Sequence, residues 1–234
     1  KKFILDNIIY RKYQIKYLDH LDKVFKKEHK RKHKNLILLE LYPSWISIIS
    51  FVYLTFLLSK KYNAKTILYL AVRPNKFKIF YYNFLKKFNI SYLKIQSFYS
   101  MENLLIPDLD DKIRYKNYFA KIKNIKNKSD ILKIKFEGIL IGDLIYDGYL
   151  KKYETYTINI NSEEFREYFI YFCKLFSFWF EYIKKNNVKS VIASHPVYEN
   201  AIPLRISYCS GNKDTFSSSI HFTYRHSKKY PSIE

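Results

Sequence analysis

Three carboxylates in the stretch Phe136–Leu150 (FEGILIGDLIYDGYL) are the first candidates for chemistry. Glu137, Asp143 and Asp147 stand there among apolar residues, and two glycines permit a tight chain path just before a predicted helix. A carboxylate in such a place can act as a general base or bind the hydroxyls of a sugar. Asp143 can instead cap the helix, because acids are stabilised at a helix N-terminus. Both interpretations stay open on the local pattern.

A second candidate group, Ser194–Tyr198 (SHPVY), follows directly after the apolar run VKSVIA. Ligands of open parallel sheets bind outside the carboxyl ends of the strands, so this is a favourable position for chemistry. His195 can exchange a proton near neutral pH, or it can serve a structural role by binding a backbone carbonyl. Tyr198 and Arg205, one helix further along, are candidate substrate-binding residues at the same place.

A polar cluster near the end of the sequence has the composition of an anion-binding group. Its members are His221, Tyr224, Arg225 and His226.

Several familiar motifs are missing from the sequence. With four glycines in all, the chain contains neither a Gly-rich phosphate loop nor a nucleophile-elbow serine. His29 and His33 lie four residues apart in a basic helix end, where solvent exposure is expected rather than metal binding. The sequence therefore predicts no metal and no bound cofactor.

The segments that must position these residues alternate between strand length and helix length. Apolar runs predict strands at residues 35–41, 65–70, 91–95, 188–193 and 216–222. Helical patterns are found at residues 43–62, 76–88, 112–124, 162–186 and 198–209. Strands separated by helices are typical of βαβ units, so the sequence predicts an α/β fold with a parallel sheet. Residues 97–111, around Pro107, are predicted to form a loop.

Two predicted helices have further features. Residues 41–59 carry no charge and are long enough to span a bilayer, but they contain Pro43 and several hydroxyl residues and lie between two predicted strands. A buried crossover helix is therefore predicted there.

The helix at 162–186 has Ser162 as its expected N-cap and a broad apolar stripe, which predicts a core face. The stripe consists of Phe165, Tyr168, Phe169, Phe172, Phe176, Trp179, Phe180 and Ile183.

The first 34 residues are predicted to form an N-terminal helical extension, because apolar residues recur three to four positions apart from Ile15 to Phe25. Its end, from Lys26 to Lys34, is almost wholly basic or polar. This end can be a solvated helix end or can touch a membrane surface. Charge is interleaved with the apolar residues throughout, so no secretory signal is visible.

The composition narrows the choice of function. The chain has 234 residues and a net charge of +21, which invites a nucleic-acid interpretation. However, 35 of the 42 basic residues are lysine, and Ile, Asn, Tyr and Phe are abundant, as an AT-rich genome would produce. Recognition of phosphates and bases usually uses arginine, so the charge is mainly explained by codon usage. Two cysteines cannot form a disulfide framework or a four-cysteine zinc site.

Two motifs resemble a known family. Glu137–Leu150 (EGILIGDLIYDGYL) together with Ala193–Tyr198 (ASHPVY) resembles bacterial capsule and surface-polysaccharide biosynthesis proteins, the GT-B-like glycosyltransferases of capsule and O-antigen clusters. Leu36–Trp45 (LILLELYPSW) also resembles their first strand and turn. The resemblance covers about residues 35–211. Past Tyr198 the chain is more polar and less glycine-rich than that family pattern, which leaves the role of Arg205 open.

The resemblance implies a Rossmann-like three-layer domain, the acceptor-side domain of a GT-B enzyme, over residues 35–234. The second, donor-binding domain is then expected to be missing or truncated, and the fragment alone to be inactive. The implied reaction transfers a sugar from a nucleotide-sugar to a glycan or lipid-linked acceptor. Asp143 or His195 would be the base, and Glu137, Asp147, Tyr198, Arg205, Arg225 and His226 would bind substrate. The expected location is the cytoplasm, with peripheral contact to the anionic inner face of the membrane.

Two other classes of function compete with this interpretation. A basic nucleic-acid-binding protein is supported by charge alone. A non-catalytic scaffold in a membrane-associated polysaccharide assembly would use the aromatic helix and the basic surface to bind a partner.

Overall fold

The computed structural model describes residues 16, 19–20, 23, 34–40, 45–69, 102–104, 114–212, 214–218 and 223–226. The chain divides into two compact units, one of residues 1–33 with 74–103 and one of residues 34–73 with 104–234. The first unit falls almost wholly outside the described residues, as do the helix predicted at 76–88 and the strand predicted at 91–95. Of the predicted N-terminal extension, residues 16, 19, 20 and 23 are described, and they are helical.

The second unit is built on a mainly parallel sheet in which the strands follow the order β2-β1-β6-β7-β8. Strands β2 (Ala64–Tyr69), β1 (Asn35–Glu40), β6 (Val188–Ala193) and β7 (Asp214–Ser218) run parallel, and β8 (Thr223–His226) is antiparallel to β7. From β1 the chain continues to β2 on one side and later returns to β6 on the other. The boundary between β1 and β6 is therefore the topological switch point of the sheet.

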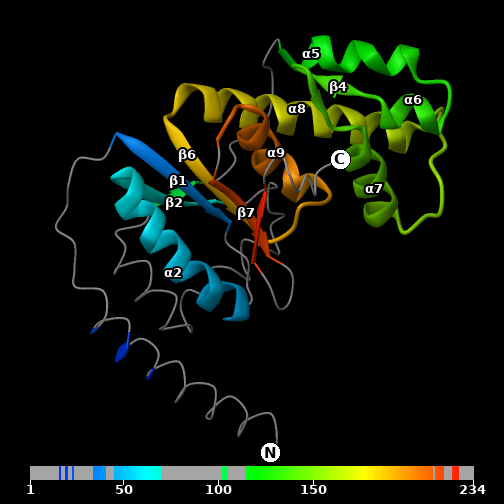
Figure 1. Cartoon of the computed structure of the whole chain (residues 1–234). Coiled ribbons are helices and arrows are strands. Elements are labelled where there is room, and N and C mark those ends of the chain that lie inside the picture. Colours follow the sequence, from blue (N-terminus) through cyan, green and yellow to red (C-terminus); the bar gives the residue numbers. More distant parts are fainter. Residues whose placement is uncertain are drawn as a thin grey trace, which may run out of the picture. The chain divides into compact units, whose positions relative to one another are not determined.

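Helices cover both faces of the sheet, so the α/β, Rossmann-like three-layer prediction is confirmed. Figure 1 shows α2 (Trp45–Tyr62) on one side and α8 (Glu163–Lys185) with α9 (Ile202–Cys209) on the other. The uncharged segment at 41–59 contributes to α2, the crossover between β1 and β2, and Phe51, Phe56 and Leu58 of this helix are buried. Within the described part of the chain, no helix is long and apolar enough to cross a membrane.

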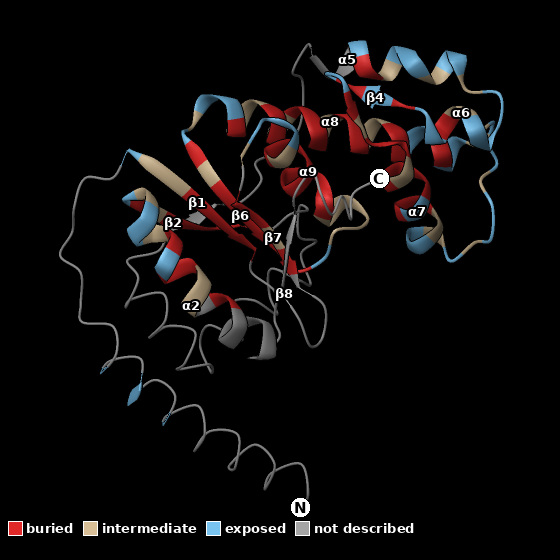
Figure 2. Ribbon diagram, in the orientation of Figure 1, coloured by how far each residue is buried: buried red, intermediate tan, exposed pale blue. Residues whose placement is uncertain are grey.

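Helix α8 organises the core. The Ser162 hydroxyl accepts a hydrogen bond from the Phe165 backbone N–H at 3.2 Å, which confirms the predicted N-cap. Every residue of the predicted aromatic stripe is buried (Figure 2). Trp179 packs edge-on against Tyr69 of β2 with ring centroids 5.0 Å apart, so the stripe faces the sheet as well as the outer helices. Because the aromatic face of α8 is buried in the core, its rings are not exposed to stack on nucleic-acid bases.

An outer group of short elements packs against α8. It consists of α5 (Arg114–Phe119), the 3₁₀ helix η1 (Ala120–Asn124), α6 (Lys128–Leu132), β4 (Lys135–Phe136), β5 (Ile139–Leu140) and α7 (Gly142–Tyr153). The turn between β4 and β5 contains Glu137 at φ 51° and Gly138 at φ 80°. Two successive residues with positive φ are what a two-residue type I′ hairpin requires, so the first part of the motif Glu137–Leu150 is a hairpin turn.

Most predicted elements are found, with one loop corrected. The loop predicted at 97–111 is wrong at Glu102–Leu104, which form the strand β3. Three residues with only one apolar side chain give no periodic signal, because pairing with a neighbouring strand rather than local pattern makes them a strand. The helix predicted at 198–209 begins with a 3₁₀ turn, η2 (Glu199–Ala201), and continues as α9.

The amino edge of the sheet, where the parallel strands begin, is closed by polar contacts. Asp214 at the start of β7 accepts hydrogen bonds from the Lys61 ammonium at 2.5 Å and from the Tyr62 hydroxyl, both at the end of α2. The Asn35 amide donates to the Tyr62 carbonyl at 2.5 Å and accepts from Asn187 at 2.6 Å. These bonds fix the C-terminal end of α2 to the starts of β1 and β7.

Candidate functional site at the carboxyl edge

The carboxyl ends of β1 and β6 meet at the switch point, and polar residues gather there. Leu39 of β1 pairs with Ile192 of β6, so Glu40, the last residue of β1, lies beside the end of β6. Ser194 and His195 follow β6 directly. In open α/β sheets this is the general position of ligand sites, because the chain diverges to both sides and leaves the strand ends accessible.

Glu40 holds both ends of the loop that follows β6. Its Oε2 accepts hydrogen bonds from the Ser194 backbone N–H at 2.5 Å and from the Ser194 hydroxyl at 2.7 Å, and its Oε1 accepts from the Asn200 amide at 2.6 Å. Glu40 is only 5% exposed, so these donors replace the water that a carboxylate would otherwise bind. One buried side chain of β1 thereby determines the shape of the loop from Ser194 to Asn200.

Burial dominates the electrostatics of this carboxyl group. It raises the pKa of Glu40 above its ordinary value, while the hydrogen bonds from Ser194 and Asn200 and the charge of His195 act in the opposite direction. The same buried region raises the pKa of the Tyr69 hydroxyl well above its ordinary value, first through desolvation and then through the charge of Glu40.

His195 is solvent-exposed and is linked to Glu40 through Ser194. Its Nδ1 lies 2.8 Å from the Ser194 Oγ. The serine hydroxyl has a single proton, which it donates to Glu40, so its oxygen accepts a hydrogen bond from Nδ1–H of the imidazole. The neutral ring then carries its lone pair on Nε2. A histidine held in this tautomer is suited to remove a proton at Nε2.

The backbone of this loop is strained at Tyr198. Its φ of 57° and ψ of −162° lie in a region that essentially only glycine adopts. Strain of this kind costs about 1–3 kcal/mol and persists only where surrounding contacts impose it. The Lys151 ammonium of α7 lies 4.0 Å from the centroid of the Tyr198 ring, a cation–π contact.

Contacts from α7 and α8 hold the loop on its outer side. The buried Tyr168 hydroxyl of α8 donates to the Glu199 carboxylate at 2.7 Å. Gly148 of α7 packs against this pair, and a Cβ at Gly148 would lie 2.1 Å from the Tyr168 hydroxyl oxygen. The second half of the motif Glu137–Leu150 therefore contributes a glycine that lets α7 approach the loop that carries His195.

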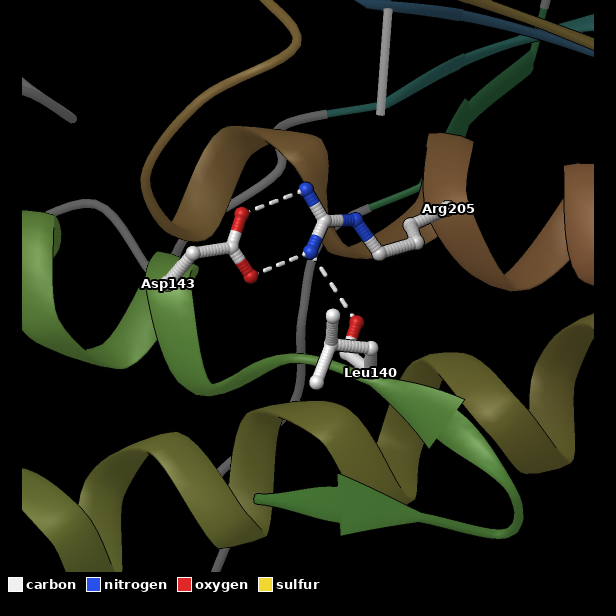
Figure 3. Close-up of polar contacts among 3 residues, drawn as sticks. All are labelled: Leu140, Asp143 and Arg205. Atoms are coloured by element: carbon white, nitrogen blue, oxygen red, sulfur yellow. Dashed lines mark hydrogen bonds and ion pairs between the residues drawn. The ribbon is translucent and has the colours of Figure 1, made fainter. Parts of the chain in front are cut away.

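Asp143 and Arg205, both predicted site residues, form an ion pair (Figure 3). Arg205 Nη1 and Nη2 donate to the two Asp143 carboxylate oxygens at 2.5 and 2.8 Å, and Nη1 also donates to the Leu140 carbonyl at 3.0 Å. Asp143 is not the N-cap of α7, which is Ile141 with no side-chain bond, but it lies in the first turn, where the helix dipole stabilises an acid. Arg205 is 3% exposed, and its Nε is a buried donor with no hydrogen-bond partner in the described part of the chain.

The other predicted site residues are distributed over separate elements. Glu137, in the β4–β5 turn, accepts a hydrogen bond from the Tyr118 hydroxyl at 2.7 Å. Asp147 is exposed on α7, and its pKa is raised first by partial desolvation and then by the charge of Asp143, against the opposing charge of Lys128. Arg225 and His226 belong to β8, and their side chains lie outside the described part, as do His29, His33 and His221.

Sequence analysis missed Glu40 and Asn200 as site residues, and it gave Ser194 no role of its own within the candidate group Ser194–Tyr198. A signal for Glu40 existed, since it is the charged residue that ends the run NLILLE, at the carboxyl end of a predicted parallel strand. Asn200 carries no comparable signal. Among the residues that the structure describes, no three His, Cys, Asp or Glu side chains gather as metal ligands.

Comparison with protein-family models, curated proteins and solved structures finds no match to this chain.

Proposed function

We propose that this chain is a glycosyltransferase-like protein of bacterial surface-polysaccharide synthesis, which transfers a sugar from a nucleotide-sugar to a hydroxyl of a glycan or lipid-linked acceptor. The observation that carries the proposal is the hydrogen-bonded chain Glu40–Ser194–His195 at the switch point of a Rossmann-like sheet. The sequence resemblance of the segments that contain Asp143 and His195 supports the substrate class. No bound cofactor is part of the proposal, since the nucleotide-sugar is a substrate.

His195 is the base in this proposal. Its Nε2 takes the proton of the acceptor hydroxyl as the hydroxyl oxygen forms a bond to the anomeric carbon. The bond between that carbon and the phosphate oxygen breaks, and the nucleoside diphosphate leaves with the electron pair. Glu40, through its charge and through Ser194, stabilises the imidazolium that forms. Glu40 and Ser194 are positioning residues because they act through the histidine.

Asp143 has a different part in the proposal. A carboxylate bound by both terminal nitrogens of a guanidinium is a poor base, because its lone pairs are already directed at donors. Asp143 and Arg205 are therefore assigned to shape the substrate site, and His195 is preferred to Asp143 as the base. Glu137, Asp147, Tyr198, Arg225 and His226 remain proposed substrate-binding residues. The proposed location is the cytoplasm, with peripheral contact at the inner face of the membrane, where a lipid-linked acceptor is found.

The test is sugar transfer from a panel of nucleotide-sugars to membrane-extracted acceptors by the full-length protein. His195→Ala should lower the rate about 10²- to 10⁴-fold, the usual contribution of a positioned base. Asp143→Asn should also abolish transfer, by releasing Arg205, and circular dichroism should show both variants folded. Tyr156→Ser changes a fully exposed side chain and serves as the matched control. Wild-type rates in both site variants would exclude the assignment.

A further inference from the structure

A continuous stretch of the outer elements is densely basic and exposed. Residues 120–136 contain six lysines and one acidic residue. All six lysines are exposed, and pale-blue ribbon along η1 and α6 in Figure 2 marks exposed residues there. We call them the lysine surface, and its members are Lys121, Lys123, Lys126, Lys128, Lys133 and Lys135.

The one acidic residue in this stretch is committed to the backbone. The Asp130 carboxylate accepts hydrogen bonds from the backbone N–H groups of Lys126 and Asn127, at 2.9 and 3.2 Å, in a capping box at the start of α6. Asp130 therefore stabilises the helix end, and the lysines around it leave a net positive field at the surface.

The aromatic side chains beside the lysine surface point inward. Tyr118 and Phe136 are buried and stack on each other with ring centroids 4.5 Å apart, and Phe136 also packs edge-on against Phe176 of α8. Proteins that bind single-stranded nucleic acid combine a basic groove with aromatic rings on which bases stack. Arginine, the usual residue for bidentate phosphate contacts, is also missing from residues 120–136. Lysine charge without rings or guanidinium groups fits a diffuse layer of anionic lipid headgroups better than a nucleic acid.

We infer that the lysine surface is the part of this protein that binds an anionic phospholipid bilayer. Each lysine near such a surface adds about 1 kcal/mol of attraction, a factor of about five in the partition coefficient, and the attraction decreases within a Debye length. The inference rests on the proposed location of the protein but not on the transfer chemistry. Failure of vesicle binding would remove the membrane contact and leave the proposed role of His195 as it stands.

The experiment is cosedimentation of the full chain with vesicles of phosphatidylcholine alone or mixed with phosphatidylserine. The wild type should bind the mixed vesicles and not the neutral ones, and added salt should release it. Lys123→Gln/Lys126→Gln/Lys133→Gln should weaken binding about a hundred-fold, as three lost charges predict. The matched control, Lys60→Gln/Lys184→Gln/Lys185→Gln, removes three exposed lysines at the ends of α2 and α8 and should bind nearly as the wild type does.

Several outcomes would overturn the inference. Equal binding to neutral and anionic vesicles would exclude charge as the cause, and equal losses in the two triple variants would show that overall charge, not this surface, is responsible. A single-stranded oligonucleotide is the competing probe. If it binds more tightly than the mixed vesicles and the first triple variant loses that binding, the surface serves nucleic acid instead.

Discussion

The two edges of the parallel sheet each contain one buried carboxylate, and the two are stabilised in opposite ways. At the amino edge, Asp214 is 2% exposed and is paired with the Lys61 ammonium and the Tyr62 hydroxyl. At the carboxyl edge, Glu40 is 5% exposed and is held by neutral donors from Ser194 and Asn200. The partners of Asp214 come from the helix before β2, whereas those of Glu40 come from one loop.

This difference indicates a structural role for Asp214 and a chemical role for Glu40. The Lys61 ammonium pairs with Asp214 while the Lys61 side chain stays 56% exposed, so little is lost by burying the carboxylate. Glu40 has only neutral donors and the nearby His195, so burial raises its pKa. Buried ionisable groups with shifted pKa values are typical of functional sites, and the carboxyl edge is where such a site is expected.

The strongest test of this difference removes each carboxylate in turn. Glu40→Ala leaves two donors of buried Ser194 and the amide of Asn200 without their acceptor, and each unmet buried donor costs about 1–3 kcal/mol. We expect a loss of about 3 kcal/mol in the free energy of unfolding, measured by urea denaturation. Asp214→Ala should cost less, because water can solvate the exposed Lys61. Equal losses, or a larger loss at Asp214, would contradict the comparison.

A second test addresses the outer support of the loop at the carboxyl edge. Gly148→Ala places a Cβ 2.1 Å from the Tyr168 hydroxyl oxygen and 3.2 Å from the Glu199 carboxylate, so we expect an overpacking cost of about 1–3 kcal/mol in thermal or urea unfolding. Tyr168→Phe deletes the clashing atom. The double variant should therefore be less destabilised than the sum of the two single changes, and strictly additive losses would show that α7 does not support the loop through this contact.

The smallest expected effect is a change in the pH dependence of stability. Because burial raises the pKa of Glu40, the folded chain binds this proton more tightly than the unfolded chain, whose value is near 4.5. The contribution of Glu40 to stability is therefore largest at low pH. It falls as the pH rises from that value through the folded-state pKa, by up to about 1.4 kcal/mol per pH unit.

Glu40→Gln should remove this part of the pH profile, as followed by urea unfolding at a series of pH values. Gln keeps a hydrogen-bonding group at the position and carries no titrating proton. The exposed Glu167→Gln on α8 is the control and should leave the profile parallel to that of the wild type. A Glu40→Gln profile that also runs parallel to the wild type would remove the distinction between the two edges.

The individual elements could be predicted because their signals are local. The run NLILLE has strand length, Ser162 with two glutamates marks the start of α8, and the spacing of the aromatic residues gives its buried face. His195 was identified from its place after a strand. By contrast, β3 depends on strand pairing, and the left-handed Glu137 in a hairpin turn has no signature of its own in the sequence.

The sequence alone therefore determined the βαβ order, the core face of α8 and the position of His195 at a strand end, because each follows from periodicity, capping or strand order along the chain. Which side chains form hydrogen bonds and ion pairs with one another was decided only by the tertiary structure. Glu40 and Ser194 are 154 residues apart, and Asp143 and Arg205 are 62 apart. The register of β1 against β6 and the close approach of α7 to the loop select these pairs. Both depend on long-range packing, which local sequence does not encode.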